Sequence, residues 1–148
     1  MSSELLAKLS AHSILEQNGK ILLIKRLGGY HNGLFALPAG HIEPGETPPI
    51  AAAREALEEI NVNINPKNLI PVHTLYVLKD QPHHPYINFY FLCKDWIGEP
   101  KILEPEKSSS LAWYEKTHLP IVEMVPYLPQ VLSCIFQNIH YSEYQIAD

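Results

Sequence analysis

Cysteine, basic residues and long apolar runs are all scarce in this chain of 148 residues. The two cysteines, Cys93 and Cys134, stand far apart and form no closely spaced metal-binding or redox pair, so reduced thiols are favoured over a disulfide. No apolar run approaches the roughly eighteen residues of a membrane-spanning helix. The first residues, MSSELLAKLSAH, lack the basic start and the apolar stretch of a secretory signal. These absences predict a cytoplasmic protein that does not enter a membrane.

Basic residues are outnumbered, because 11 Lys and Arg stand against 16 Asp and Glu, for a formal net charge of −5. A long nucleic acid is therefore not expected as the main partner, since its phosphates are bound mainly by Lys and Arg. A small anionic ligand is still compatible with the sequence, because one bound cation can reverse the charge of a site. The length and a hydrophobic content of 46% predict a single domain over residues 1–148.

Turn and cap signals divide the first part of the chain. Asn18-Gly19 is a strong hairpin signal between two apolar runs, so strands are expected at 11–17 and 20–26. Thr47 is a candidate N-cap, and the two prolines after it suit the first turn of a helix over residues 46–60.

The remaining apolar runs predict more strands and a second helix. Apolar residues at helical spacing from Leu128 to Ile139 predict a C-terminal helix whose apolar stripe packs on the core. Mixed strands with one central helix favour an α/β or α+β sandwich. The further strands are expected at 34–37, 69–79, 86–95 and 111–115.

Three carboxylates, Glu55, Glu58 and Glu59, fall on one side of the central helix when residues are placed at about 100° intervals. Like charges at this spacing destabilise a helix, and Arg54 can offset only one of them. A solvated acidic surface and a site for a divalent cation are both compatible with this cluster, because carboxylates suit hard cations such as Mg²⁺ or Mn²⁺. Gly40 would let the preceding loop and its carbonyl approach a ligand closely. The opposite side, expected to face the core, carries Ile50, Ala53, Leu57 and Ile60.

This stretch resembles the Nudix box, the signature of Nudix hydrolases, which reads Gly, five residues, Glu, seven residues and then Arg-Glu-apolar-x-Glu-Glu-x-Gly-apolar. Only the second glycine differs, and the Asn in its place can also adopt the left-handed conformation that ends a helix. Roughly residues 10–120 are similar to MutT-like, nucleotide-cleaving members of the family. The resemblance implies an α/β/α sandwich with a mixed β-sheet and the Nudix helix. The box positions are occupied here by Gly40, Glu46, Arg54, Glu55, Ala56, Glu58, Glu59, Asn61 and Val62.

The resemblance implies Mg²⁺-dependent hydrolysis, with Mn²⁺ as an alternative cofactor, of a phosphoanhydride bond in a nucleoside triphosphate or a related nucleoside diphosphate derivative. It also implies that Glu46 and Arg54 orient the helix through an ion pair. Which glutamate activates the attacking water stays open. The residues implied for metal binding are Gly40, Glu55, Glu58, Glu59 and Glu106, with Glu104 as the close competitor of Glu106; the four glutamates Glu55, Glu58, Glu59 and Glu106 are also implied for catalysis.

Other functions remain compatible with the same residues. A nucleotide-sugar hydrolase or another diphosphate hydrolase would use the same metal site. A catalytically silent Nudix-fold sensor would bind nucleotides without cleaving them, although the complete set of three helix carboxylates argues against it. Homodimers are common among Nudix relatives, so a homodimer is a candidate assembly.

Several aromatic side chains are candidates to hold a nucleobase, because an aromatic face can stack on a base. Core packing is the alternative for each of them. His31, His41 and one of the neighbours Lys25 and Arg26 are candidates to contact phosphates. Tyr30 and Tyr86, which stand in or beside loops, are favoured for this role, and core packing is favoured for Phe89. The aromatic candidates are Tyr30, Phe35, Tyr86, Phe89 and Trp113.

Overall fold

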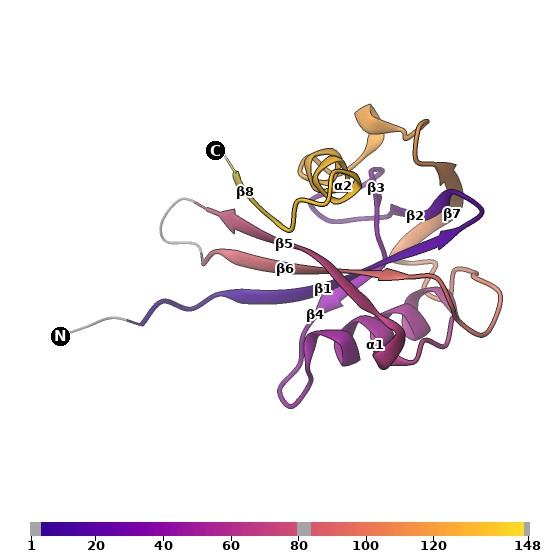
Figure 1. Cartoon of the computed structure of the whole chain (residues 1–148), viewed down its shortest axis with the longest axis horizontal. Coiled ribbons are helices and arrows are strands. Elements are labelled where there is room, and N and C mark those ends of the chain that lie inside the picture. Colours follow the sequence, from indigo (N-terminus) through magenta and orange to yellow (C-terminus); the bar gives the residue numbers. More distant parts are fainter. Residues whose placement is uncertain (1–3, 80–83, 147–148) are drawn as a thin grey trace.

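Figure 1 shows the computed structural model, which describes residues 4–79 and 84–146. Its strands are β1 (Lys8–Gln17), β2 (Lys20–Arg26), β3 (Phe35–Ala36), β4 (Ala39–His41), β5 (Ile70–Leu78), β6 (Tyr86–Cys93), β7 (Ser108–Glu115) and β8 (Tyr141–Gln145). Its helices are α1 (Pro48–Ile60) and α2 (Leu128–Phe136), with the short 3-10 helices η1 (Pro66–Asn68) and η2 (Ile121–Glu123).

Within the described residues, the eight strands form one mixed sheet in which β3, β2, β1, β6, β5 and β8 follow one another, while β4 pairs with β1 and β7 pairs with β2. The two helices lie on opposite sides of this sheet (Figure 1). A separate group of buried apolar side chains lies under each helix. The predicted α/β/α sandwich with a mixed sheet is confirmed.

The first hairpin forms where the sequence predicts it. β1 and β2 pair in antiparallel fashion, with Gln17 opposite Lys20. The two turn residues have positive φ angles, 54° at Asn18 and 75° at Gly19, as a tight two-residue hairpin turn requires.

The sequence patterns do not predict β4 and β8. β4 is only three residues long, directly follows Pro38 and has a glycine at its centre, so it carries no alternating pattern of its own. β8 is a polar edge strand that pairs in parallel with β5 alone. Both strands are therefore set by their partners in the sheet.

β1 divides the sheet and thereby opens the space for a site. Its last residues pair with β2, whereas residues 10–12 pair with β4. Along its other edge, β1 pairs in parallel with β6 over residues 8–15. β2 and β4 therefore leave the same edge of β1 at different points, and the two cavities described below lie against the residues at this division.

The core face of α1 differs from the predicted one. Ile50 and Leu57, expected to face the core, are 45% and 48% exposed. Counted at about 100° per residue from Glu55, the buried face centres near 100° rather than near 180°. The small side chains on this face allow close packing on the sheet, so the acidic side lies next to the core face instead of opposite it. The buried residues of α1 are Ala51, Ala52, Ala53, Ala56 and Ile60.

Both ends of α1 carry the predicted caps. Thr47 accepts a hydrogen bond from the backbone N–H of Ile50 at 3.4 Å, and prolines occupy the first turn. Asn61 ends the helix with φ 65° and ψ 25°, and its N–H donates to the carbonyl of Leu57. Asn61 thus adopts the left-handed conformation usual for a glycine at this position.

The C-terminal helix is shorter than its apolar spacing predicts. Leu128, Val131 and Leu132 are buried against the core as expected, but α2 ends at Phe136 and leaves Ile139 beyond it and 44% exposed. Among the described residues, no helix is long and apolar enough to cross a membrane. Both cysteines are free thiols, as predicted.

Candidate active site

A cavity of about 440 Å³ lies between α1, β4, the end of β2 and the loop before β7. α1 contributes Glu55 and Glu59, and β4 contributes backbone from residues 39–41. The cavity therefore combines carboxylates, two cationic side chains and exposed backbone. It is lined by Ile24, Arg26, Leu27, Leu37, Ala39, Gly40, His41, Glu43, Glu55, Glu59, Glu104, Lys107 and Ser108.

Arg54 links α1 to the end of β4 and to the loop that follows β4. Its guanidinium makes two hydrogen bonds to Glu46, with Nε to Oε2 at 2.6 Å and Nη2 to Oε1 at 2.9 Å. Nη2 also donates to the carbonyl of His41 at 3.0 Å. These bonds raise the pKa of Arg54 and lower the pKa of Glu46, so both groups are charged at neutral pH. This geometry fits the orienting role that the resemblance implies for Glu46 and Arg54.

The same guanidinium also reaches the acidic side of α1. Nη1 donates to Glu55 at 2.8 Å and to Glu58 at 3.3 Å. The Glu58 side chain is 51% exposed and does not line the cavity, whereas the Glu55 side chain is 17% exposed and does. Arg54 thus partly neutralises Glu55 and holds Glu58 at the rim.

Gly40 packs directly against the Glu55 carboxylate. A Cβ added to Gly40 would overlap the carboxylate carbon and both oxygens. The φ angle of Gly40 is not in the left-handed region, so the position requires glycine for space rather than for backbone freedom.

Glu59 lies at the boundary between the acidic side and the core face of α1. Its burial, a hydrogen bond to Glu55 and the negative charge of Glu55 raise the pKa of Glu59 to about 9, against a smaller opposing effect of the Ala39 backbone. Two carboxyl groups this close repel each other when both are ionised, and the oxygen-rich setting suits Mg²⁺ or Mn²⁺.

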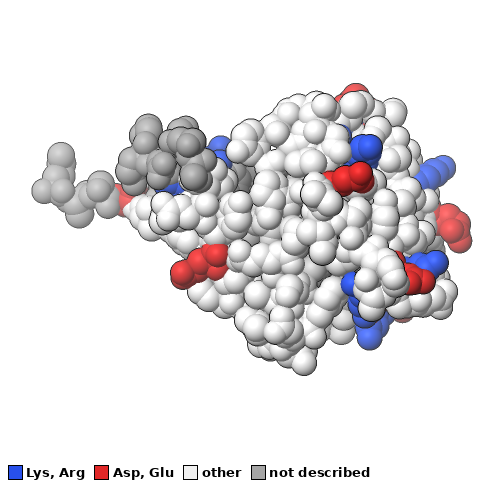
Figure 2. Space-filling model, turned by 90° about the horizontal axis from the view of Figure 1, so that it is seen from above, with Lys and Arg blue, Asp and Glu red and all other residues white. Residues whose placement is uncertain are grey.

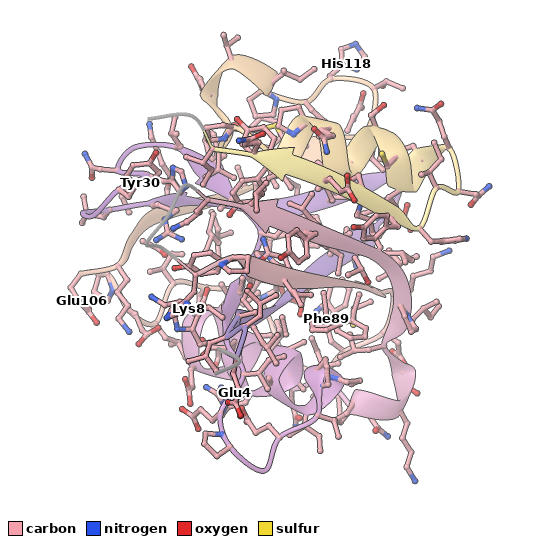
Figure 3. The ribbon with its side chains drawn as sticks, turned by 90° about the vertical axis from the view of Figure 1, so that its left-hand side faces the viewer. Glu4, Lys8, Tyr30, Phe89, Glu106 and His118 are labelled. Carbon is pink, nitrogen blue, oxygen red and sulfur yellow. The ribbon has the colours of Figure 1, made fainter. Side chains whose placement is uncertain are left out.

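Glu104, rather than Glu106, reaches the cavity. The backbone N–H groups of Lys107 and Ser108 both donate to the carbonyl of Glu104, so residues 104–108 form a tight turn. Glu104 opens this turn facing the cavity, and its carboxylate lies 3.3 Å from Lys107 Nζ. Glu106 is exposed, and Figure 3 shows it at the outer edge of the molecule.

Glu55 and Glu59 lie close together, but the carboxylates around the cavity do not form a closed cage. Over residues 4–79 and 84–146, no three His, Cys, Asp or Glu side chains converge closely enough to hold a metal ion.

A second cavity of about 300 Å³ adjoins the first one on the side of β6. Arg26 and residues 39–41 line both cavities. Tyrosine rings and histidines form much of the second cavity's wall. It is lined by Ser10, His12, Arg26, Tyr30, His31, Ala39, Gly40, His41, Val77, Lys79, Tyr86, Asn88, Tyr127 and Ile146.

The structure brings Tyr30 and Tyr86 to the second cavity, but not Phe35 or Trp113. Tyr30 is 81% exposed at the mouth, and Figure 3 shows it on the same side of the molecule as Glu106. Lys79 Nζ lies 4.3 Å from the centre of the Tyr86 ring. Phe35 is buried under α2 with its ring edge-to-face with Tyr114, and Trp113 stacks on Trp96 on the α1 side. Both of these rings pack against the core instead.

Arg26 has a signal in the sequence, whereas several other cavity residues have none. Arg26 follows Leu22 and Ile24 on the α1 side of β2, so strand alternation alone would have selected it over Lys25. His12 and Asn88 sit inside strands with no local signal, and burial lowers the pKa of His12 to about 3, which keeps it neutral. Tyr127 precedes α2 and reaches the cavity only through the fold. His31 and His41, which the sequence does propose, both line it.

Comparisons with known proteins give matches in sequence and in fold. The model of the NUDIX domain family matches residues 8–133. The human protein named 8-oxo-dGDP phosphatase NUDT18 is 32% identical over 108 residues, which cover 72% of this chain and 31% of that protein. A protein of Bacillus subtilis strain 168 named putative 8-oxo-dGTP diphosphatase is 30% identical over 113 residues, covering 76% of this chain and 68% of its own.

The chain spans about a third of the length of several of the curated relatives that it matches. Among solved structures, the MutT NUDIX hydrolase from Burkholderia pseudomallei has a TM-score of 0.79 at 22% identity, covering 86% of this chain and 97% of that one. At this identity the likeness concerns the fold, and it agrees with the layered arrangement in Figure 1.

Proposed function

This chain belongs to the Nudix hydrolase family, and we propose that it hydrolyses a phosphoanhydride bond of a nucleoside triphosphate or a related nucleoside diphosphate derivative with Mg²⁺ or Mn²⁺. The observation that carries the proposal is the junction of a carboxylate-lined cavity and a tyrosine-lined cavity, which share Arg26 and β4. The names of the human and Bacillus relatives, an 8-oxo-dGDP phosphatase and a putative 8-oxo-dGTP diphosphatase, support a phosphoanhydride of a nucleotide as the substrate class.

The metal would be held on the α1 side of the first cavity. Glu55 and Glu59 would be ligands, Glu104 would join them from the opposite loop, and the Gly40 carbonyl is the nearest backbone candidate. Glu58, bonded to Arg54 at the rim, would support Glu55 through that arginine. When bound, the cation would neutralise the charge that develops on the phosphates and would lower the pKa of an attacking water.

The remaining side chains would bind and orient the substrate. Arg26 and Lys107, both on the cavity wall, would contact phosphate oxygens as charged donors. A carboxylate among Glu55, Glu59 and Glu104 would accept the proton of the attacking water, because these are the acidic groups that face the phosphates. The tyrosine-lined cavity next to Arg26 would receive the base.

The test is hydrolysis of a panel of nucleoside triphosphates, nucleoside diphosphates, nucleotide sugars and dinucleoside polyphosphates, with phosphate and pyrophosphate release followed in Mg²⁺ and in Mn²⁺. Glu59→Gln should lower kcat by at least about a hundredfold, because it removes a charged ligand but keeps nearly the same shape. Glu123→Gln, which changes an exposed carboxylate outside both cavities, is the matched control and should leave kcat unchanged.

Two outcomes would contradict the proposal. One is the absence of turnover on every compound of the panel while nucleotides still bind, which would indicate a nucleotide sensor. The other is near wild-type activity in Glu59→Gln. Preferred cleavage of a nucleotide sugar would keep the metal site but replace the triphosphate as the substrate.

A further inference from the structure

The floor of the second cavity is a buried polar network, in contrast with the apolar sheet around it. Ser10, His12 and Asn88 line the cavity, and only 7%, 9% and 3% of their surfaces are exposed. Tyr90, 1% exposed, lies directly behind them. We call these four residues the floor network.

Strand pairing places the floor network in one block. β1 and β6 run in parallel with Ser10 beside Asn88 and His12 beside Tyr90. Because alternate strand residues share a face, the next position along β1 on this side is Ile14, which is buried under α2. The sheet face is therefore apolar where α2 covers it and polar where the second cavity opens.

Hydrogen bonds fix the side chains of this network. The Ser10 hydroxyl donates to Asn88 Oδ1 at 2.6 Å and lies 3.1 Å from His12 Nε2. Asn88 Nδ2 lies 3.4 Å from the Tyr90 hydroxyl, and the His12 ring stacks on the Tyr90 ring with centroids 4.5 Å apart. Ser10 holds the amide oxygen, and the amide nitrogen of Asn88 also bonds the hydroxyl of Tyr127 on the cavity wall, so a ligand that accepts an N–H from Asn88 takes the place of a tyrosine hydroxyl.

The walls of the cavity suit a flat ligand. Tyr30, Tyr86 and Tyr127 line it, and a cavity of about 300 Å³ is at the small end of ligand pockets. Tyrosine rings stack on a planar group, which would then present its edge to the floor. Buried polar groups that meet a ligand edge discriminate strongly, because a mismatched ligand leaves them without partners.

We propose that the floor network reads the edge of the substrate's nucleobase and that Asn88 is the residue that sets base preference. This inference rests on the proposed function for the presence of a base in the substrate. Asn88 Nδ2 donates to a ring nitrogen or carbonyl oxygen of the base, while Ser10 prevents the amide from turning over. His12 acts as a positioning residue, since it packs on Tyr90 and contacts Ser10 from the other side.

The test measures binding rather than turnover, so that it does not depend on the metal site. The affinities of metal-free protein for AMP, GMP, CMP and UMP are determined by isothermal titration calorimetry. The wild type should distinguish its best from its worst base by at least about fivefold. Asn88→Asp, which replaces a donor by an acceptor, should change the order of the four bases by a similar factor.

Two further variants keep the test decisive. Ser10→Ala frees the Asn88 amide to turn over and should reduce the discrimination between bases to less than about twofold, even if Asn88→Asp does not fold. Asn68→Asp makes the same chemical change on an exposed residue that lines neither cavity and should keep the wild-type order.

Equal affinity for all four nucleotides in the wild type would overturn the inference. An unchanged order of bases in both Asn88→Asp and Ser10→Ala would also overturn it. If base preference changes in these two variants as expected but the protein hydrolyses no nucleotide, the inference is supported and the proposed function is contradicted.

Discussion

At the scale of single residues, the absence of a side chain at Gly40 leaves room for the Glu55 carboxylate in the wall of the first cavity. Gly40 sits in β4 opposite Ala11 of β1, in ordinary strand pairing. The glycines with positive φ angles meet turn requirements, whereas Gly40 meets a requirement for space next to the Glu55 carboxylate. Its replacement should therefore act through Glu55 and not through the backbone.

Gly40→Ala should lower the free energy of unfolding by about 1–3 kcal/mol, because the added Cβ overlaps Glu55 in a packed site. It should also lower kcat by displacing Glu55, a proposed metal ligand. Urea denaturation of Gly40→Ala, Glu55→Ala and the double variant measures the coupling. In the Glu55→Ala background the stability cost of Gly40→Ala should largely vanish, and equal costs in both backgrounds would show that Glu55 is not the obstacle.

At the scale of elements, the rotation of α1 about its own axis decides how deeply its carboxylates lie. Helical spacing alone places the acidic and core faces on opposite sides, with Leu57 toward the core. In the structure the alanines pack on the sheet, so the core face lies beside the acidic face and Glu59 falls between them. The bulky apolar side chain of Leu57 does not mark the core face of α1, because α1 lies so close to β1 and β4 that only small side chains fit between them.

Ala56→Leu and Leu57→Ala test this orientation. Ala56 is fully buried, so Ala56→Leu should overpack the interface and cost about 1–3 kcal/mol in free energy of unfolding. Leu57 is 48% exposed, so Leu57→Ala should cost less than about 1 kcal/mol. Chemical denaturation measures both. A loss of about 2–5 kcal/mol for Leu57→Ala is usual for a fully buried leucine, and it would show instead that Leu57 faces the core.

At the scale of the whole molecule, sequence reasoning succeeds where a signal is local. The Asn18-Gly19 turn, the Thr47 and Asn61 caps and the spacing of the glutamates on α1 are each readable within a few residues. Short sequence patterns do not indicate that Glu104, rather than Glu106, lines the first cavity. They do not indicate the residues of the floor network either. Both depend on contacts between segments that are distant in the sequence, which only the paired strands bring together.

The distribution of charge over the molecule fits a small anionic ligand. Figure 2 shows one face on which Lys and Arg are scattered among uncharged side chains rather than gathered into a broad basic surface. The site instead places Arg26 and Lys107 beside four carboxylates inside a cavity. Within this cavity, Arg26 and Lys107 supply the positive charge that phosphates would meet.

We expect metal binding and the stability of the whole molecule to be coupled through Glu59, a proposed metal ligand. Burial and the neighbouring Glu55 raise the pKa of Glu59 from 4.5 to about 9, so between these values the metal-free folded protein holds a proton that the unfolded chain releases. This bound proton contributes to the free energy of unfolding of the metal-free protein. The contribution is complete below pH 4.5 and is lost as the pH rises toward 9, with a slope of up to about 1.4 kcal/mol per pH unit.

Urea denaturation in EDTA between pH 7 and 8.5 should therefore show falling stability in the wild type and a flatter profile in Glu59→Gln. Mg²⁺ displaces the proton, so it should raise the melting temperature of the wild type more at pH 8.5 than at pH 7. In Glu59→Gln this pH dependence of the Mg²⁺ effect should disappear, whereas Glu123→Gln should behave as the wild type does. Parallel pH profiles in wild type and Glu59→Gln would show that Glu59 is ionised without a metal and would contradict the raised pKa of Glu59.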